Sequence, residues 1–410
     1  MTCLKSEKKR ILFVDDEPRV LGGLSRMLRP LRDEWDMAFL PSGADALELL
    51  SRERFDVIVS DMRMPGMDGA QLLSEVMRRH PHMVRIVLSG HSEKEMVLRS
   101  VGPTHQYLAK PCDADLLKAT VSRACALRAI LDNAQLKELV SRLDALPSLP
   151  QLYLEIVEEM RSPMASIQRV GRIIAQDLGM TAKVLQLVNS AFFGVRKQVR
   201  DPVQAASLLG METLKALVLS LHVFSSSRDA LPAGFSLESL WQHSTAVGQL
   251  ARGIAIAERA DKKVVEDSLL AGLLHDVGLL VLTTQLPDQY QHVLELGRGE
   301  GCSLWAAERR IFGAGHPEVG AYLLGLWGLP DPVVEALAFH HTPSECLDSR
   351  FSPLLAVHVA DAWSDHANLS QNGLEGSVLD LHYLRRLGLE NRLPVWKAAL
   401  ERTPEEAKAR

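Results

Sequence analysis

Short apolar runs in the first 110 residues lead directly into side chains suited to phosphate or metal chemistry. The run ILFV is followed by Asp15 and Asp16, and FDVIVS is followed by Asp61; RIVLS ends in Ser89 and HQYLAK ends in Lys110. Such runs, alternating with helical patterns, predict a parallel sheet wrapped by helices. Because open α/β sheets bind ligands at the carboxyl ends of their strands, we expect these side chains to form one site.

These residue types fit the transfer of a phosphoryl group to a carboxylate. An aspartate that accepts phosphorus needs a hard cation, and Mg2+ prefers one or two carboxylates together with water and phosphate oxygens. Asp15, Asp16 and Asp61 can supply the carboxylates, while Ser89 and Lys110 can hold the new phosphoryl oxygens. Each residue taken singly also fits a turn, cap or loop. It is their occurrence together and in this order that favours a phosphorylation site.

The first 125 or so residues resemble the receiver domain of two-component response regulators. The resemblance rests on the acidic pair, the acceptor with its MPGMDG continuation, the hydroxyl at Ser89 and the Lys110-Pro111 step. It implies a doubly wound, flavodoxin-like domain with a five-stranded parallel sheet. It also implies that a histidine kinase or phosphotransfer protein phosphorylates Asp61, with Mg2+ held by the three aspartates. Tyr107 matches the aromatic switch position of the family, although an aromatic ring near a strand end often only packs.

Length and composition limit the remaining possibilities. The 410 residues, 47% hydrophobic and 24% charged, predict two or three ordinary globular domains. With a net charge of −5 and no Lys/Arg block beyond KSEKKR, we expect no nucleic-acid partner. The five scattered cysteines suit reduced thiols, and the longest apolar run, AGLLHDVGLLVL, is too short to span a membrane. We therefore expect a cytoplasmic protein without membrane association.

Strand signals nearly vanish after about residue 110. From Asp113 the pattern predicts one long helix, whose first part closes the receiver and whose remainder connects it to the next domain. Packing of this helix on its own domain and a coiled-coil seam in a homodimer are the alternatives for that connector. The rest of the chain shows helical patterns bounded by Gly, Pro, Ser, Asp or Asn. We expect a receiver at 9–125, a helical linker at 126–144, an all-α output domain at 145–345 and a C-terminal helical extension at 346–410.

Candidate metal ligands gather in the second half of the chain. His275 and Asp276, which we expect within one helix, cannot chelate an ion alone, but residues from neighbouring helices can join them. A second site bridged by Asp276 would pair two divalent transition metals, and paired metals activate water for phosphoester cleavage. The alternative is a metal-free polar core in which carboxylates pair with imidazoles, and His358 is interpreted as filler. The candidate ligands are His243, His275, Asp276 and Asp361 for the first ion, and Asp276, His316, His340 and His341 for the second.

This constellation is similar to the HD superfamily of metal-dependent phosphohydrolases, which carries the pattern His, His-Asp, Asp on helices. More closely, the segments LWQHS, AGLLHDVGLLVL, GHPEVGAYLLGLWGLPDPVVEAL and FHH resemble the HDOD output domain. The upstream segments LPSLPQL and LQLVNSAFFG extend the resemblance over about residues 140 to 345. It implies an HD-like helical fold and a non-catalytic module that contacts a downstream signalling protein.

Two departures weaken a hydrolase interpretation. The related HD-GYP cyclic-di-GMP phosphodiesterases carry a lysine after HD-x-G, where this chain has Leu279, and a Gly-Tyr-Pro tract after the paired histidines, where it has HHTPSECLDSRFSP. The missing lysine removes a cation that would bind phosphate. We therefore assign no catalytic residue. A metal-dependent phosphodiesterase switched by the receiver stays as the alternative to a response regulator that acts through protein contacts.

Overall fold

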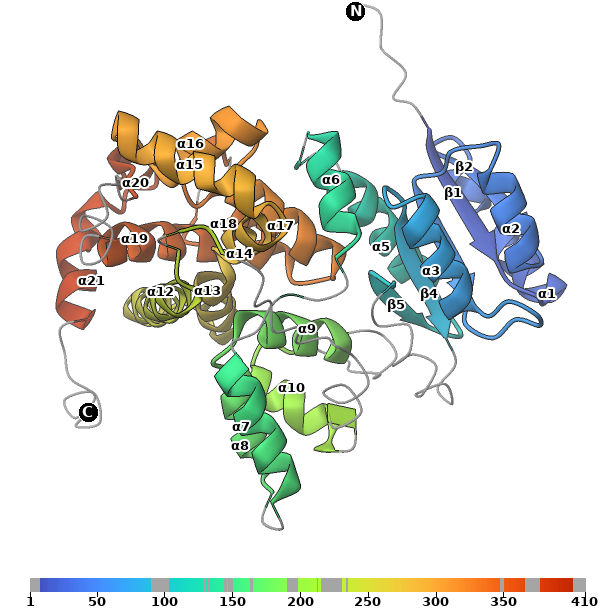
Figure 1. Cartoon of the computed structure of the whole chain (residues 1–410), viewed down its shortest axis with the longest axis horizontal. Helices are drawn as coiled ribbons and strands as arrows, with labels where there is room; N and C mark the ends of the chain where they lie inside the picture. Colours follow the sequence, from blue (N-terminus) through green and yellow to red (C-terminus); the bar gives the residue numbers. More distant parts are fainter. Residues whose placement is uncertain are drawn as a thin grey trace, which may run out of the picture. The chain divides into compact units, whose positions relative to one another are not determined.

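The structure is a computed structural model that describes residues 8–89, 103–127, 130–131, 133–143, 146, 150–162, 165–189, 198–211, 213–214, 231–233, 235–346, 350–365 and 377–400. The chain divides into two compact units. One contains a sheet and the other is helical (Figure 1). The first is built mainly from Met1–Ala145, and the second from Leu146–Leu185, Gln198–Gly325 and Leu329–Arg410.

A five-stranded parallel sheet in the order β2-β1-β3-β4-β5 forms the centre of the first unit. This confirms the predicted doubly wound α/β fold, in which ligands bind where the strand order reverses. The order reverses at β1, so the carboxyl ends of β1 and β3 lie side by side. The strands are β1 Lys9–Val14, β2 Trp35–Leu40, β3 Val57–Asp61, β4 Val84–Ser89 and β5 Gln106–Ala109.

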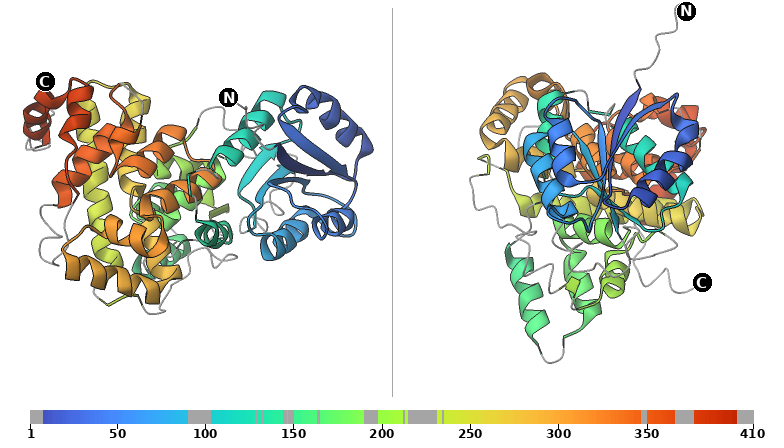
Figure 2. Two further views of the ribbon diagram at one scale, coloured as in Figure 1. Left: turned by 90° about the horizontal axis from the view of Figure 1, so that it is seen from above. Right: turned by 90° about the vertical axis from the view of Figure 1, so that its right-hand side faces the viewer.

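Helices cover both faces of this sheet (Figure 2). Alternate strand residues point to opposite faces, so each strand contributes to two layers of core. On one face Leu12, Ile58 and Val87 lie in a buried cluster with Leu72 and Val76 of the helix that follows β3. The helices of this unit are α1 Pro18–Met27, α2 Gly43–Leu50, α3 Gly69–Arg79, α5 Ala114–Leu127 and α6 Ala134–Ser141, with a 3-10 turn at Arg29–Leu31.

The continuous helix predicted from Asp113 is wrong, because α5 and α6 are separate helices. Asn133 starts α6, since its side chain accepts hydrogen bonds from the backbone N–H groups of Gln135 and Leu136. The helix belongs to the first unit. Arg85, a fully buried residue of β4, donates a hydrogen bond to the carbonyl of Ser141 at the end of α6.

The second unit is helical, which confirms the predicted all-α fold of this part of the chain. Helices α12, α13, α18 and α19 pack against one another and form its centre. Helix α21 also packs on α12, where Trp396 is fully buried and donates its indole N–H to Glu258. The helices are α7 Pro150–Arg161, α8 Ile167–Ile174, α9 Leu178–Val188, α10 Pro202–Leu209, α12 Leu237–Ala257, α13 Lys262–Leu274, α14 Val277–Gln285, α15 Pro287–Glu300, α16 Leu304–Phe312, α17 His316–Leu326, α18 Asp331–Phe339, α19 Pro353–Asp365, α20 Leu381–Arg386 and α21 Leu393–Leu400, with 3-10 turns at Pro343–Glu345 and Glu390–Arg392.

No helix in the described parts of the chain is by itself long and apolar enough to cross a membrane. One sharply bent pair, Lys262–Gln285 with Pro287–Glu300, passes the test of length and composition when taken together.

Candidate functional site

The strand ends of the first unit bring the predicted receiver residues together. Lys110 Nζ lies 2.7 Å from Asp15 Oδ2 and 2.5 Å from Asp61 Oδ1. Asp15 and Asp61 are buried, whereas Asp16 beside them is partly exposed. Ser89 ends β4, in register with Ala109, the residue before Lys110. The edge of the sheet therefore carries two buried carboxylates on one lysine, with a partly exposed third carboxylate next to them.

The MPGMDG segment folds back on the backbone of Asp61. A Cβ at Gly69 would lie 2.2 Å from the backbone oxygen of Asp61, so only glycine fits this approach. Helix α3 begins directly there, with a reciprocal capping box between Asp68 and Gln71. The backbone N–H of Arg63 donates to Asp61 Oδ2 at 3.1 Å. The local sequence thus fixes the orientation of the Asp61 carboxylate.

One lysine balances only part of the carboxylate charge at this edge. Burial raises the pKa of Asp61, and the hydrogen bond from Lys110 only partly offsets this. Burial would lower the pKa of Lys110, but its bonds to Asp15 and Asp61 raise it instead, so this amine stays charged. Among the described residues, the buried hydroxyl of Ser89 has no hydrogen-bond partner. Tyr107 is buried in the α2–α3 core cluster, and its switch role stays a prediction.

The predicted metal ligands of the second unit come from five places in the helical core. The prediction that His275 and Asp276 lie within one helix is wrong, because the chain breaks there between α13 and α14. This break lets two adjacent side chains face one site. His243 lies in α12, His275 and Asp276 at the α13–α14 junction, His316 at the start of α17, His340 and His341 directly after α18, and Asp361 in α19.

A close backbone contact holds two of these places together. A Cβ at Gly278 would lie 2.0 Å from the backbone oxygen of His316. The first turn of α14 therefore packs against the start of α17 without any side chain between them. This contact brings Asp276, two residues before Gly278, to His316: Oδ1 of the carboxylate lies 3.3 Å from Nε2 of the imidazole.

The first four ligand atoms have the spacing of a metal coordination sphere. Metal bonds of about 2.0–2.2 Å in tetrahedral geometry place ligand atoms roughly 3.3–3.6 Å apart. His243 Nε2 lies 3.2 Å from His275 Nε2 and 3.2 Å from Asp361 Oδ1. Asp276 Oδ2 lies 3.6 Å from His243 Nε2 and 3.3 Å from His275 Nε2. His275 Nε2 lies 3.5 Å from Asp361 Oδ1, so the measured edges match those of one ion's ligand set.

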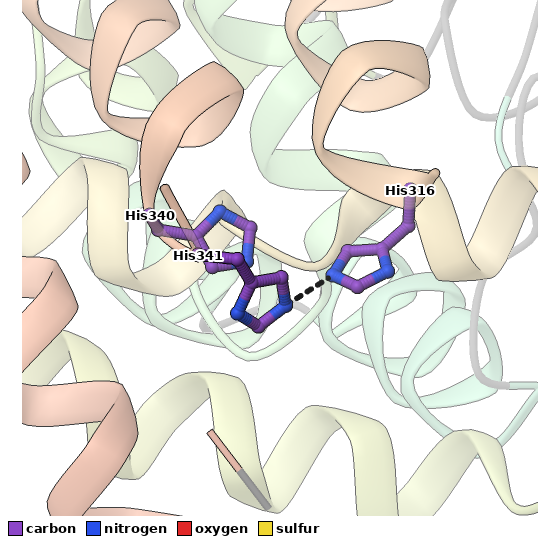
Figure 3. A group of neighbouring side chains, drawn as sticks. All are labelled: His316, His340 and His341. Carbon is purple, nitrogen blue, oxygen red and sulfur yellow. Dashed lines mark hydrogen bonds between the residues drawn. The ribbon is translucent and has the colours of Figure 1, made fainter. Parts of the chain in front are cut away.

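A second set of ligand atoms uses the other oxygen of Asp276. His316 Nε2 lies 3.3 Å from Asp276 Oδ1. The same nitrogen lies 3.1 Å from His341 Nε2 (Figure 3). His340 Nε2 lies 3.9 Å from the same carboxylate oxygen. Ligand atoms of the three histidines lie within 4.8 Å of one another. Asp276 therefore has one oxygen in each set, as a bridging carboxylate between two ions would.

In three of the histidines, hydrogen bonds to one ring nitrogen show which nitrogen faces the centre. Nδ1 of His275 and of His340 lies 2.8 Å from a backbone carbonyl, and Nδ1 of His316 lies 2.7 Å from a carboxylate oxygen of Glu308. These partners accept, so each Nδ1 carries a hydrogen. The other nitrogen, Nε2, is therefore the atom that faces the centre, as in metal-bound histidines.

The contacts at the centre fit a metal-free polar core as well as a bound cation. Nε2 atoms face each other at 3.1 and 3.2 Å in the two histidine pairs, which requires a proton or a cation between them. Within the described structure, the buried Nε2 of His340 has no hydrogen-bond partner. A buried polar atom of this kind calls for an explanation, and a bound ion is one. The residues fit a pair of divalent ions.

The carboxylates and imidazoles of the centre have strongly shifted pKa values. Burial would raise the pKa of Asp276 and Asp361, but the surrounding histidines hold both well below the usual range. Burial and neighbouring histidines lower the pKa of His340 and bring that of His341 to about 3, so both rings are neutral, the form that binds metals. Burial would also lower the pKa of His316, but Glu308 raises it to about 8.

Supporting residues around the centre were missed at the level of sequence. Glu308 is fully buried and bonded to His316. Ser377 donates to Asp361 Oδ2 at 2.7 Å. His358, interpreted as filler, is buried and joins the carbonyl of His340 to the backbone N–H of Asp380. None of these residues belongs to a metal motif, so only the tertiary contacts reveal them.

Comparisons with known proteins match two separate domains, and the second match begins where the second compact unit begins. The response regulator receiver domain matches residues 11–122, and the HDOD domain matches residues 146–343. Asp361 lies beyond the second match, although its side chain belongs to the first ligand set.

Several known proteins are similar to parts of this chain. An uncharacterized protein of Treponema pallidum (strain Nichols) is 31% identical over 245 residues, which cover 58% of this chain and 46% of that protein. The hydrogenase transcriptional regulatory protein HoxA of Cupriavidus necator is 37% identical over 30% of this chain and 25% of its own length. The chain thus spans less than half the length of these curated relatives. Among solved structures, the MmoQ response regulator of Methylococcus capsulatus is 25% identical, with a TM-score of 0.48, over 63% of this chain and 98% of that one.

Proposed function

The chain is a response regulator with an N-terminal receiver domain and a C-terminal HDOD domain, and on this premise we propose that Asp61 is its phosphorylation site. A cognate histidine kinase or phosphotransfer protein would donate the phosphoryl group. The observation that carries the proposal is the contact of Lys110 with both Asp15 and Asp61 at the switch point of the sheet. That lysine is placed to balance charge on the incoming phosphoryl oxygens.

We propose that Asp15, Asp16 and Asp61 hold Mg2+ in the receiver. Bound Mg2+ would neutralise developing charge on the transferred group. In this step the Asp61 carboxylate attacks phosphorus while the bond from phosphorus to the donor breaks and the donor leaves with that electron pair. Lys110 pairs with the phosphoryl oxygens. The hydroxyl of Ser89, which has no hydrogen-bond partner among the described residues, turns to donate to one of these oxygens. Movement of Ser89 would then let the Tyr107 ring shift, which biases the receiver between two conformations.

Intact-mass measurement tests the phosphorylation site. The full chain is exposed to a small phosphodonor with Mg2+, and the expected result is a gain of one phosphoryl group. Asp61→Asn should show no gain, and chelation of Mg2+ should abolish the gain in the wild-type chain. An unchanged mass for the wild type, with the receiver folded, would refute the proposal.

We propose that the helical domain binds two divalent transition-metal ions through His243, His275, Asp276 and Asp361 on one side and Asp276, His316, His340 and His341 on the other. The matched edge lengths of the first set and the shared carboxylate of Asp276 support this. Elemental analysis of the full chain after loading with Mn2+, in excess Mg2+ to fill the receiver, is expected to give two Mn2+ ions per chain. Imidazole-rich sites disfavour Mg2+, so the two kinds of site can be separated in this way.

For the output we propose a change of contacts with a downstream signalling protein in the cytoplasm, controlled by the state of Asp61. A pull-down with the full chain in both phosphorylation states tests this, because a partner whose recovery is independent of phosphorylation would contradict it. A second candidate is a metal-dependent phosphohydrolase acting on a cyclic dinucleotide. The complete two-ion ligand set favours it, whereas Leu279 at the lysine position disfavours it.

Hydrolysis assays separate these two outputs. Turnover of a cyclic dinucleotide that requires metal and disappears in His275→Ala and Asp276→Ala would establish the phosphohydrolase. A metal-loaded chain without turnover would favour the contact-based output.

A further inference from the structure

Glu308 makes an unusual set of buried contacts beside the metal centre. It lies in α16 and is fully buried, together with Tyr290 of α15. Oε1 accepts the phenolic O–H of Tyr290 at 2.7 Å. Oε2 accepts both the backbone N–H and the Nδ1–H of His316, each at 2.7 Å. One carboxylate thus receives three hydrogen bonds, two of them from a single candidate metal ligand.

These contacts determine the state of the His316 ring. The backbone bond fixes Oε2 at the start of α17, and the Nδ1 bond then sets the rotation of the imidazole about that point. Because a carboxylate oxygen only accepts, the hydrogen must lie on Nδ1. Nε2 is left to face Asp276 Oδ1 at 3.3 Å and His341 Nε2 at 3.1 Å.

A carboxylate partner distinguishes His316 from its neighbours in the centre. Nδ1 of His275 and of His340 contacts the carbonyl three residues earlier in its own helix. A carboxylate withdraws the Nδ1 hydrogen more strongly than a carbonyl does and makes Nε2 the better electron donor. His316 is therefore prepared as a strong ligand for the second ion.

Tyr290 stabilises this arrangement from the far side. Burial and the neighbouring carboxylate raise the pKa of the Tyr290 phenol well above its usual value, so the hydroxyl keeps its hydrogen and donates. The bond occupies Oε1 and leaves Oε2 to His316. A buried carboxylate oxygen without this partner would lose a hydrogen bond that fixes its rotation.

We propose that Glu308, oriented by Tyr290, is a positioning residue that sets the affinity of the second metal site, formed by Asp276, His316, His340 and His341. This inference rests on the proposed two-ion centre. Neither residue belongs to either ligand set. Their effect passes through the tautomer, orientation and basicity of the His316 imidazole.

The test measures metal affinity of the full chain, independently of any catalytic activity. Metal-free wild type, Glu308→Gln and Tyr290→Phe are titrated with Mn2+ in excess Mg2+, and free Mn2+ is followed by electron paramagnetic resonance. Loss of a partner of this kind lowers metal affinity by about 10–100-fold. We expect that loss for one of two Mn2+ ions in Glu308→Gln, and a smaller loss at the same site in Tyr290→Phe. The other ion should bind as in the wild type.

Glu318→Gln is the matched control. Glu318 is also a carboxylate beside the α16–α17 junction, where it contacts the backbone N–H of Gly315 and the side chain of Arg309. None of these contacts is to a candidate ligand, so both affinities should stay at the wild-type values. Thermal melts check that each variant is folded. If Glu308→Gln does not fold, the Mn2+ affinities of Tyr290→Phe, which keeps the carboxylate, test the positioning role.

The possible results distinguish the role of Glu308 and Tyr290 from the existence of the two-ion centre. Wild type with two Mn2+ ions and variants with unchanged affinities would overturn the role of Glu308 and Tyr290 while leaving the two-ion centre intact. Wild type that binds no Mn2+ in the helical domain would instead overturn the centre itself. An equal loss at both ions in the variants would also overturn the inference, because a site-specific effect through His316 requires the first ion to be spared.

Discussion

Removal of single carboxylates gives the sharpest test of the two-ion arrangement. Asp276 has one oxygen in each ligand set, whereas Asp361 contributes Oδ1 to the first set and uses Oδ2 to accept from Ser377. Asp276→Ala should therefore abolish both ions, and Asp361→Ala should abolish one. The expected Mn2+ content is two ions in the wild type, one in Asp361→Ala and none in Asp276→Ala. The exposed Asp288→Ala, at the start of α15, should retain two.

The same arrangement sets the size of the thermal effect. An ion at 100 times its Kd stabilises a folded protein by about 2.7 kcal/mol, so two ions contribute about 5 kcal/mol. For a domain of this size each kcal/mol raises Tm by about 2–4 °C. Adding Mn2+ should raise the Tm of the helical unit by about 10–20 °C in the wild type, by about 5–10 °C in Asp361→Ala and not at all in Asp276→Ala. Comparing each variant with and without metal removes its own effect on the metal-free fold.

Two results would refute this reasoning. If Asp276→Ala keeps one ion together with a Tm response, the carboxylate does not bridge two sites. If Asp361→Ala keeps both ions, its Oδ1 is a hydrogen-bond partner of His243 and His275 rather than a ligand.

Three further substitutions test other parts of the structure. In Arg85→Met the carbonyl of Ser141 loses a buried donor, at a cost in folding free energy of about 1–3 kcal/mol. Amide hydrogen exchange in α6 should therefore rise more than in β3. Unchanged exchange in α6 would contradict the contact. Gly278→Ala places a Cβ against the His316 backbone, so we expect a loss of about 1–3 kcal/mol in melts and a weakened second ion, whereas wild-type metal content would show that the contact is dispensable. Lys110→Met removes the cation on Asp61, so time-resolved intact mass should show phosphorylation at least about tenfold slower; a wild-type rate would exclude the lysine from that step.

The meeting of the receiver side chains could be predicted from sequence because a regular sheet sets their positions. In a parallel sheet all strands end at the same edge, so residues that follow apolar runs must meet there, as Asp15, Asp61 and Lys110 do. Strand β2 was not among the recognised runs. Its sequence WDMAFL contains a charge, and most of its side chains are only half-buried at the edge of the sheet. The apolar pattern that marks a central strand is therefore weak there.

The histidine and aspartate cluster could be predicted from sequence only in part, because helices from distant segments form it. Residue types identified the candidate ligands, but the helix break at His275 depends on packing against other helices. Glu308 shows the limit most clearly. In the run AAERRIF it precedes two arginines and resembles an exposed helix charge, yet it is fully buried against Tyr290 and His316. Only the tertiary fold supplies the three donors that make its burial favourable.

Metal binding and turnover are separable properties of this centre. The ligand sets depend on carboxylates and imidazoles, while binding of a phosphoester also needs a cation for its non-bridging oxygens. At Leu279, the third residue of α14, the chain has a buried apolar side chain where the HD-GYP phosphodiesterases carry a lysine. An apolar side chain at this position supplies no charge to a phosphate, and it leaves the candidate ligand residues unchanged. Metal content therefore tests the centre, whereas hydrolysis tests a property that depends on residues outside the ligand sets.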